Sequence, residues 1–573
     1  MNAVMLQSFD WYQSDDGQFF NKLAKRAAEL KSLGINAVWL PPVCKATGTN
    51  DVGYGVYDLY DLGEFDIKGA RRTKYGSKEE LLACIDALHQ QGISVYADLV
   101  LNHKAAADYT ERCQAVKVNP NNRNENISDA HEIEAWTGFS FPARKDKYSD
   151  FKWHWYHFTG VDFDNATGEN GVFRILGDGK SWSDDVSAEN GNFDYLMFAD
   201  IDYAHPEVIE ETKRWAEWFI KETNIDGVRL DAIKHIDTSF MSDFISHILN
   251  GNISKENFYV FGEYWIRDPE SNSEYLYKTD YDIDLFDVGL HFAFFDASTQ
   301  KENYDLRKLF DQALVKIHPA KAVTFVDNHD TQPGQALTSW VETWFKAIAY
   351  ACILLRKDGY PCLFSADLDG MSGPYPQPAQ RESLEKLLKL RMALAYGDQD
   401  DYLEDPHCIG FVRHGEDLRN GERHKLAVVF SNDEWRKYAP GEESYRLAEQ
   451  AAASADKVEN EEYMAASKNN DASNSDNSTV VENNETNCPS NKIYDNPSEA
   501  SDNPWTDKGL FITMNMGVDQ AGKIFKDHFY VFKDERVIVD DKGLAVFPVP
   551  ARNLSCWAEE NLDLDKLISD RNK

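Results

Sequence analysis

Four stretches of this sequence place a carboxylate or a histidine directly after a short apolar run. They are ADLVLNH at 97–103, GVRLDAIKH at 227–235, FGEYW at 261–265 and FVDNHD at 325–330. One charged residue at the end of a strand is unremarkable, because such positions usually face water. Four such ends on separate strands are hard to explain by solvation alone. They indicate one site with several carboxylates, which suits nucleophilic and general acid–base chemistry.

The carboxylates in these stretches differ in their surroundings. Arg229 precedes Asp231 by two positions, so both side chains point to the same face of a strand. A guanidinium there would keep Asp231 ionised and oriented, as a nucleophile requires. Glu263 lies beside Trp265, and partial burial with nearby negative charge would raise its pKa, as a general acid requires. Asp330 supplies a third carboxylate.

The elements that must position these residues repeat one theme over the first 400 residues. A short apolar run is followed by a polar turn and a segment with helical period. The candidate strands are 3–9, 35–42, 94–101, 226–231, 259–263, 285–290, 322–327 and 361–367. Eight β-then-α units in about 390 residues predict an α/β fold, a closed (β/α)8 TIM barrel rather than an open sheet. Catalytic groups in such a barrel lie where strands end.

Two regions depart from this rhythm. Residues 102–205 are rich in Trp, Tyr, Asp, Asn and Gly, which predicts an inserted irregular β-rich domain after the third strand. After residue 395, the runs CIGFVRH, KLAVVFS, FYVFK and GLAVFPVP predict a C-terminal antiparallel β-sandwich over 396–573. The barrel would then comprise 1–101 and 206–395. Within the last domain, about 447–505 is an acidic low-complexity insertion that we expect to be disordered.

Composition excludes several classes of partner. The 573 residues carry a net charge of -37, which repels phosphate backbones and anionic lipids, so we expect no nucleic acid and no membrane partner. The first residues read as a strand rather than a signal peptide, and eight cysteines occur without a CxxC motif. These features predict a cytoplasmic protein. A monomer is favoured, although the sequence leaves the oligomeric state open.

In order and content, the four stretches resemble the conserved regions of the α-amylase family of glycoside hydrolases (family 13 type). A fifth stretch, NFDYLMFADIDYAHPEV at 192–208, follows the same pattern. DVGYGVYDLYDLGEF, RTKYGSKEELL and SDFKWHWYHF resemble the bacterial liquefying α-amylases and their intracellular relatives. The resemblance is strong from residue 1 to about 400 and weak in the last domain.

This resemblance implies retaining, endo-acting hydrolysis of α-1,4-glucosidic bonds in starch, glycogen or maltodextrins. Asp231 would be the nucleophile, Glu263 the acid/base and Asp330 the carboxylate that binds and distorts the sugar. In a retaining enzyme the first two carboxyl groups lie about 5–5.5 Å apart. The substrate-binding residues would be Tyr54, His103, Arg229, Lys234, Trp265 and His329.

Two alternatives remain at this point. A maltooligosaccharide-specific hydrolase or a transglycosylase would use the same three carboxylates, because sugar and water compete for one covalent intermediate. A non-catalytic glycan-binding protein on the same barrel is disfavoured, because such proteins should have lost a carboxylate or Arg229, and none is lost here.

The resemblance also implies one Ca²⁺ site. Its ligands would be Asn102, Asp194, Asp200 and the backbone carbonyl of His235. A second calcium and a sodium, found in the secreted liquefying enzymes, are doubtful because the matching positions are Thr159, Ser183 and Ala204, and only Asp202 remains. Asp184 and Asp185 lie close enough in sequence to form a rearranged, weaker site.

Overall fold

The computed structural model describes residues 2–250, 255–419, 421–434 and 510–571. Its centre is a closed barrel of eight parallel strands, which confirms the predicted (β/α)8 architecture. The strands are β1 (Met5–Gln7), β2 (Ala37–Leu40), β5 (Ser94–Leu99), β13 (Gly227–Leu230), β14 (Tyr259–Gly262), β15 (Asp284–Phe286), β16 (Ala322–Phe325) and β17 (Tyr360–Phe364). They follow one another around the barrel in chain order, and β17 pairs with β1 to close it.

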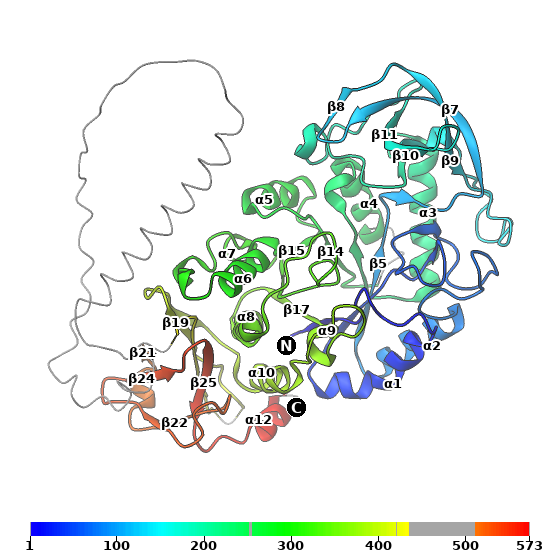
Figure 1. Cartoon of the computed structure of the whole chain (residues 1–573). Helices are drawn as coiled ribbons and strands as arrows, with labels where there is room; N and C mark the ends of the chain where they lie inside the picture. The colour runs from blue at the N-terminus through cyan, green and yellow to red at the C-terminus, as the bar shows by residue number, and fades with distance from the viewer. Residues whose placement is uncertain (1, 251–254, 420, 435–509, 572–573) are drawn as a thin grey trace, which may run out of the picture.

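Helices surround the barrel (Figure 1). They are α1 (Phe19–Ser32), α2 (Lys78–Gln90), α3 (Pro206–Thr223), α4 (Thr238–Asn250), α5 (Pro269–Lys278), α6 (Val288–Gln300), α7 (Leu314–Ile317), α8 (Thr343–Leu355), α9 (Ser365–Asp369) and α10 (Arg381–Leu394). Because helices cover the outside and side chains fill the inside, the strands are buried on both faces and read as continuous apolar runs. Among the helices of the described ranges, none is both long and apolar enough to cross a bilayer.

Two predicted strands extend into the helix that follows them. The run 285–290 ends as a strand at Phe286, because the carboxylate of Asp287 accepts the backbone N–H of Leu290 at 2.9 Å and caps α6. The run 361–367 ends at Phe364, and the residues after it form α9. In both places a continuous apolar run covers the end of a strand and the start of a helix, and periodicity alone does not separate the two.

Aromatic rings fill the barrel interior beneath the predicted site. Trp39 lies 5.5 Å from Phe286 and 6.1 Å from Phe261, and Phe325 lies 5.4 Å from Phe286, as ring-centroid distances. These side chains come from β2, β14, β15 and β16, so the barrel is a packed core rather than a pore. The polar residues at the strand ends therefore rest on a rigid apolar floor.

An antiparallel sheet is inserted between β5 and α3. Its strands are β6 (His103–Lys104), β7 (Tyr109–Asn119), β8 (Asn122–Asn126), β9 (His131–Gly138), β10 (Phe158–Asp164), β11 (Glu169–Ile175) and β12 (Ala199–Ile201). The sheet joins the barrel where β6 pairs with β12, which places His103 opposite Asp200. A two-stranded sheet, β3 (Lys45–Ala46) and β4 (Val56–Asp58), lies in the loop after β2.

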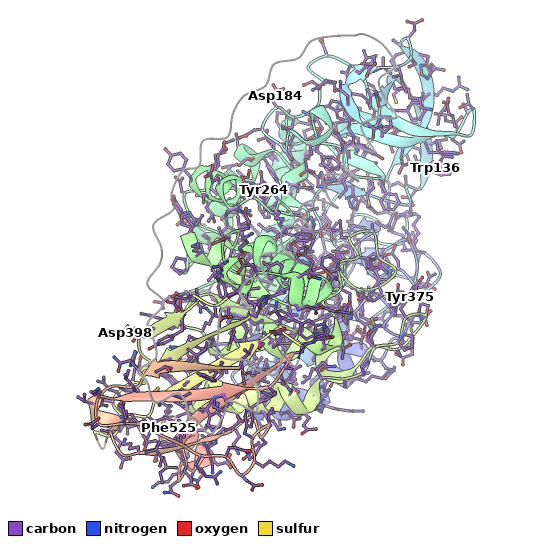
Figure 2. All side chains as sticks on the ribbon, turned by 60° about the vertical axis from the view of Figure 1, so that its left-hand side comes forward. Trp136, Asp184, Tyr264, Tyr375, Asp398 and Phe525 are labelled. Carbon is purple, nitrogen blue, oxygen red and sulfur yellow. The ribbon has the colours of Figure 1, made fainter. Side chains whose placement is uncertain are left out.

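The C-terminal region forms two antiparallel sheets. The larger comprises β18 (Gln399–Tyr402), β19 (Cys408–Arg413), β20 (Leu426–Ser431), β25 (Asn553–Glu559), β22 (Ile524–Asp527) and β23 (Val537–Ile538); the smaller pairs β21 (Leu510–Asn515) with β24 (Leu544–Val549). A final helix, α12 (Leu564–Arg571), follows. Figure 2 shows Trp136 of the inserted sheet and Phe525 of β22 at opposite ends of the molecule, with the barrel between them.

One predicted strand in this region is wrong. Residues 529–533 (FYVFK) form bends after β22 rather than a strand. The carboxylate of Asp527 accepts the backbone N–H groups of Phe529, Val531 and Phe532 at 2.8–3.0 Å, so these groups do not pair with a neighbouring strand. The predicted acidic insertion at about 447–505 lies outside the described residues, and the domain divisions at 101, 205 and 395 remain predictions.

Candidate active site

Arg229 is the centre of the predicted catalytic group. It is fully buried in β13, and its Nη1 lies 2.6 Å from Asp231 Oδ1 and 2.8 Å from Asp98 Oδ1. Its Nη2 contacts the carboxylate of Glu263. One guanidinium thus holds carboxylates from the ends of three adjacent strands, β5, β13 and β14. The expected contact between Arg229 and Asp231 is present, and Asp98 binds the same guanidinium.

The contact between Arg229 and Glu263 was not foreseen from sequence spacing, because Glu263 belongs to the neighbouring strand. Parallel pairing places Arg229 opposite Phe261 on β14, and Glu263 follows two positions later on the same face. Asp231 and Glu263 therefore share one guanidinium, which fixes both carboxylates at one place above the barrel.

The acidic groups at this place influence one another. Burial raises the pKa of Glu263 well above its usual range, Arg229 opposes the shift, and the charges of Asp231, Asp330 and Asp98 add to it. Burial, with the charges of Asp231 and Asp98, raises the pKa of Asp330 to about 7. A carboxyl group with a raised pKa retains its proton near neutral pH and can donate it. The expectation for Glu263 is thereby supported.

Stacked rings form one wall of the site. The ring of Tyr54 lies parallel to His329 at 5.0 Å and to Trp11 at 6.0 Å, and the Tyr54 hydroxyl donates to Asp98 at 2.9 Å. The amide of Gln7 lies 2.9 Å from His329 Nδ1, and Nε2 of the same ring lies 3.2 Å from Asp330 Oδ2. Burial holds the pKa of His329 well below its usual range, so the ring is neutral. Its single proton then belongs on Nε2, facing Asp330.

Hydrogen bonds and a buried ion pair fix the loop that carries Asp330. The side-chain oxygen of Asn328 accepts the backbone N–H groups of Asp330 and Thr331, both at 2.9 Å. Thr331 Oγ1 donates to Asp327 at 2.7 Å, and Lys346 of α8 contacts the same carboxylate. Lys346 also lies 2.8 Å from Asp367 of α9, the helix that follows β17. This buried cation was missed, although a lone lysine in the apolar sequence TWFKAIAYACILL was a signal for it.

The remaining predicted substrate residues lie around this centre. His103 is buried, and its Nε2 lies 2.8 Å from the backbone carbonyl of Tyr54. Lys234 reaches the backbone carbonyl of Trp265 at 3.2 Å and Glu189 at 2.8 Å. Lys234 and Trp265 are thus brought together, and both lie in the segments that carry Asp231 and Glu263.

Three of the four residues predicted to bind calcium, Asn102, Asp194 and Asp200, lie together. Asn102 Nδ2 donates to Asp200 Oδ1 at 3.1 Å, while Asn102 Oδ1 and Asp194 Oδ2 are buried and have no hydrogen-bond partner among the described residues. Burial raises the pKa of Asp194 to about 7, and the charges of Asp202 and Asp237 add to this shift. Burial also raises the pKa of Asp200 well above its usual range, and the charge of Asp194 adds to that shift. Two buried carboxylates and unpaired oxygens are the donor set that a hard divalent cation prefers.

At the positions considered for a second calcium and a sodium, the side chains pair with other residues. Thr159 donates to the carboxylate of Asp200, and Ser183 donates to Asp237 at 2.6 Å. Asp202 forms a buried ion pair with Lys180 at 2.7 Å. The single carboxylate that remains there already has a cationic partner.

Comparison with known proteins gives a consistent assignment. A family model described as "Alpha amylase, catalytic domain" matches residues 21–477. An α-amylase of Bacillus licheniformis is 50% identical over 418 residues, which cover 73% of this chain and 81% of that protein. The cytoplasmic α-amylase of Escherichia coli (strain K12) is 41% identical over 461 residues, which cover 78% of this chain and 91% of the relative.

The fold comparison agrees. The crystal structure of an α-amylase from Geobacillus thermoleovorans, complexed with acarbose, matches with a TM-score of 0.56 at 18% identity, covering 98% of this chain and 99% of that one. At that identity the match supports the fold alone. The family match over most of the chain, together with two relatives above 40% identity, shows that this chain belongs to the α-amylase family and is a glycoside hydrolase.

Proposed function

We propose that this chain is an endo-acting α-amylase that hydrolyses α-1,4-glucosidic bonds of starch, glycogen or maltodextrins with retention of anomeric configuration. The observation that carries the proposal is the single Arg229 guanidinium that contacts both Asp231 and Glu263. A retaining glycosidase needs these two carboxyl groups close together and in opposite protonation states.

In the first step Glu263 donates its proton to the glycosidic oxygen while an oxygen of Asp231 attacks the anomeric carbon. The bond to the leaving sugar breaks, and a covalent glycosyl-enzyme forms. Glu263, now ionised, then takes a proton from a water molecule, whose oxygen attacks the same carbon and releases Asp231. Asp330 and the Nε2–H of His329 would bind the hydroxyls of the reacting sugar, and the Tyr54 ring would stack on it.

Arg229 has a different role in each state of Asp231. Its positive charge favours the ionised nucleophile before attack and stabilises the carboxylate when it leaves. The resemblance places Arg229 among the substrate-binding residues, but its side chain is fully buried beneath the carboxylates, so we propose that it positions them rather than contacting the sugar. Lys234 and Trp265 belong to the segments that carry Asp231 and Glu263, and we expect them to contact the leaving sugars.

One calcium ion would be held by Asn102, Asp194, Asp200 and the carbonyl of His235. When bound, it supplies positive charge to two buried carboxylates. His235 is four residues after Asp231, and Asp200 lies on β12 of the inserted sheet. These ligands would therefore tie the inserted sheet to the nucleophile loop. The ion pair of Asp202 with Lys180 disfavours a second calcium.

We expect the protein to act in the cytoplasm on glycogen or maltodextrins, as a monomer. The Escherichia coli relative named as a cytoplasmic α-amylase supports this location. Cell fractionation and size-exclusion chromatography with light scattering would measure location and oligomeric state.

The test is product analysis on amylose and on a chromophore-labelled maltoheptaose. Wild-type protein should abolish iodine staining early and release short products that are initially α-anomers by NMR. Glu263→Gln should lower kcat by a factor on the order of 10³, whereas Glu274→Gln, an exposed glutamate of α5, should leave it unchanged.

Other outcomes would change the assignment. Products longer than the substrate would favour the transglycosylase, and a single product length from the first minutes would favour the maltooligosaccharide-specific enzyme. A wild-type protein that cleaves neither substrate would contradict the proposal.

A further inference from the structure

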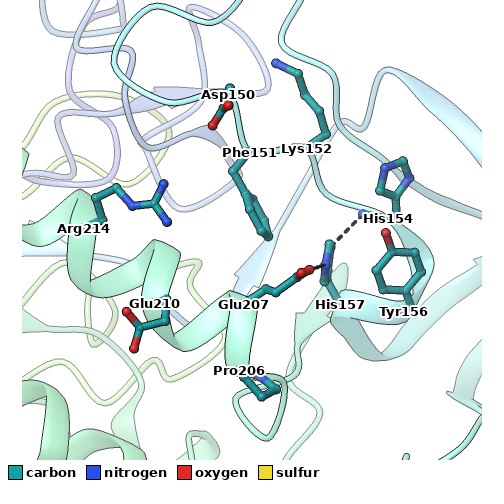
Figure 3. Close-up of a pocket in the computed structure, with 10 residues that line it drawn as sticks. All are labelled: Asp150, Phe151, Lys152, His154, Tyr156, His157, Pro206, Glu207, Glu210 and Arg214. Atoms are coloured by element: carbon teal, nitrogen blue, oxygen red, sulfur yellow. Dashed lines mark hydrogen bonds and ion pairs between the residues drawn. The ribbon is translucent and has the colours of Figure 1, made fainter.

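A hollow lies outside the catalytic group, between residues 150–157 and the first turns of α3 (Figure 3). Its volume is about 510 Å³, within the usual size of small-molecule sites. None of the residues that we place in catalysis or in the calcium site lines it. It is therefore a separate feature of the surface.

Aromatic side chains form one side of this hollow. Tyr156 is 38% exposed, which is high for so large a ring, and His154 stacks against it at 5.4 Å with an interplanar angle of 20°. Phe151 also lines the hollow (Figure 3). An exposed tyrosine supported by a second ring offers a flat apolar face with a polar edge, which suits the C–H face of a pyranose ring.

Charged groups of both signs surround the rings. Asp150, Glu207 and Glu210 supply carboxylates, while Lys152 and Arg214 supply cations. The mixed signs disfavour an anion, which three carboxylates would repel, and a cation, which Lys152 and Arg214 would repel. A neutral polyol is favoured, because each hydroxyl both donates and accepts hydrogen bonds and can use both kinds of side chain.

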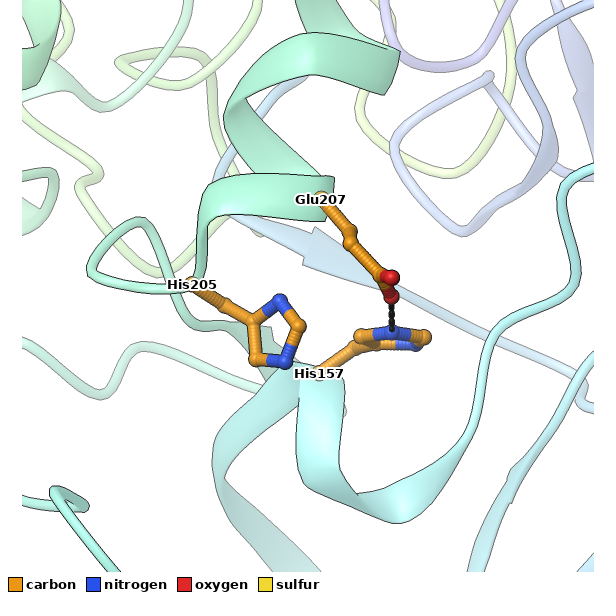
Figure 4. A group of neighbouring side chains, drawn as sticks. All are labelled: His157, His205 and Glu207. Carbon is orange, nitrogen blue, oxygen red and sulfur yellow. Dashed lines mark ion pairs between the residues drawn. The ribbon is translucent and has the colours of Figure 1, made fainter.

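A buried N–H donor without a partner among the described residues, that of His157, also faces the hollow. His157 is 1% exposed, and its Nδ1 accepts the backbone N–H of His154 at 3.0 Å. Burial lowers the pKa of His157 to about 3, so the ring is neutral and its proton belongs on Nε2. This Nε2–H has no hydrogen-bond partner among the described residues, and Glu207 Oε2 is 3.5 Å away (Figures 3 and 4).

The same residues raise the alternative of a metal site, because donor atoms of His157, His205 and Glu207 lie within 4.8 Å of one another (Figure 4). A metal on His157 Nε2 needs the lone pair of that nitrogen. The lone pair of Nδ1 is already used by the His154 N–H, and a neutral imidazole has only one unprotonated nitrogen. A metal there would require an imidazolate, so a ligand that accepts a hydrogen bond fits better.

We propose that this hollow is a second glucan-binding site, in which a segment of an α-glucan chain stacks on Tyr156 and hydrogen-bonds to His157 Nε2–H, Glu207 and Glu210. The proposal rests on the proposed function, since it assigns the same polymer to a second place on the chain. Occupation of both sites by one polymer would raise the local concentration of glucan at the catalytic group.

Binding is measured with the Glu263→Gln protein, in which bound glucan is not cleaved. We expect calorimetry with maltoheptaose to give two sites per chain, and electrophoresis in glycogen-containing gels to show strong retardation. Tyr156→Ala should reduce the stoichiometry to one and weaken retention by glycogen roughly 5- to 10-fold, as the loss of one stacking contact implies. The matched control is Tyr277→Ala, because Tyr277 is a more exposed tyrosine on α5.

Kinetics separate this site from catalysis. In the otherwise wild-type protein, Tyr156→Ala should raise KM for glycogen by a similar factor and leave kcat/KM for a short chromophore-labelled maltotrioside unchanged. Glu210→Gln, an exposed side chain on α3 that is safe for folding, should act in the same direction, and thermal melting checks that each variant is folded.

Three results would overturn the inference. One is that both variants match the Tyr277→Ala control in stoichiometry, gel retention and KM for glycogen. A second is stoichiometric Zn²⁺ binding lost in His157→Ala, with glucan binding unchanged. A third is loss of activity on the short substrate in the folded Tyr156→Ala protein. Failure of the proposed function is distinct, because the wild-type protein would then cleave neither substrate.

Discussion

At the scale of single residues, the site is a group of carboxyl groups around one buried cation. Arg229 contacts the carboxylates of Asp231, Asp98 and Glu263. The charge of Asp330 raises the pKa of Glu263. Since burial raises the pKa of Glu263 and the charges of the other carboxylates raise it further, Glu263 retains its proton near neutral pH. The acid role that we propose for Glu263 would thus arise from its position rather than from its residue type.

This argument predicts a direction for the pH dependence. The alkaline limb of kcat/KM reports deprotonation of Glu263 in the free enzyme. Asp330→Asn removes one negative charge that disfavours ionised Glu263, so the pKa of Glu263 falls and the alkaline limb moves to lower pH. The residual activity on an activated maltotrioside measures the shift. Asp243→Asn, at an exposed position of α4, should leave the limb in place, and a shift to higher pH in Asp330→Asn would contradict the argument.

At the scale of elements, buried polar groups beneath the loops fix the positions of the loops that form the site. Lys346 on α8 joins Asp327 after β16 to Asp367 after β17, and Tyr350 donates to Asp367 at 2.6 Å. The Lys346 ammonium also lies 3.4 Å from the centroid of the Trp340 ring. The loop with His329 and Asp330 is therefore fixed by a charge on a neighbouring helix.

Lys346→Met should destabilise the protein by about 3–5 kcal/mol at pH 8, because it leaves two buried carboxylates without a cation. The cost should be smaller at pH 5, because burial raises the pKa of Asp327 to about 7 and this carboxyl group can then bind a proton and become neutral. Urea denaturation at both pH values measures the difference. The exposed Lys389→Met is the control, and an equal loss of stability at the two pH values would refute the argument.

The proposed calcium ligands Asp200 and His235 belong to two elements, β12 of the inserted sheet and the loop after β13. Without a cation, the folded pKa of Asp194 is about 7, above its usual value in an unfolded chain. Between these two values the folded state binds more protons than the unfolded state, so its stability falls as pH rises. A bound calcium ion would keep the carboxylates ionised and remove this loss.

The difference in melting temperature between calcium and chelator should therefore grow from pH 5 to pH 8. Scanning calorimetry of the wild-type protein measures it, and Asp194→Asn should abolish most of the difference. A gap that stays constant over this pH range would show that the carboxylates are not the groups concerned.

The sequence predicted the barrel, and the convergence of carboxylates at its strand ends, better than the contacts that hold them. Asp231, Glu263 and Asp330 stand in recognisable motifs at strand ends, because parallel strands bring their carboxyl ends to one face. Lys346 was missed, since one lysine in a helix sequence does not reveal what lies opposite it. The strand predicted at 529–533 failed because Asp527 binds backbone groups that an apolar pattern would assign to a sheet.

At the scale of the whole molecule, the C-terminal strands are shared between two cores. Ile409 and Phe411 of β19 belong to the same buried cluster as the barrel, whereas Cys408 and Val412 belong to a second cluster between the two C-terminal sheets. The alternation follows the two faces of a strand. It explains why β19 and β20 are buried along their whole length, a pattern whose covering surfaces the sequence could not identify.

Asn432, directly after β20, connects these parts. It is fully buried, and its Nδ2 donates to the backbone carbonyls of Lys301 and Tyr304, both at 2.7 Å, in the segment after α6. Asn432→Ala leaves both carbonyls without this donor and should cost about 1–3 kcal/mol of stability. The catalytic group makes no contact with Asn432, so kcat and KM on maltoheptaose should not change while the protein is folded.

Urea denaturation followed by activity and by tryptophan fluorescence separates two cases. If the barrel and the C-terminal sheets form one cooperative unit through their shared core, both signals in Asn432→Ala shift together to lower urea, and the exposed Asn165→Ala leaves them in place. If the fluorescence change splits into two transitions and activity follows only the later one, the C-terminal sheets unfold independently. That result would show that the shared core does not couple them to the barrel, and a chain ending near residue 396 should then remain active.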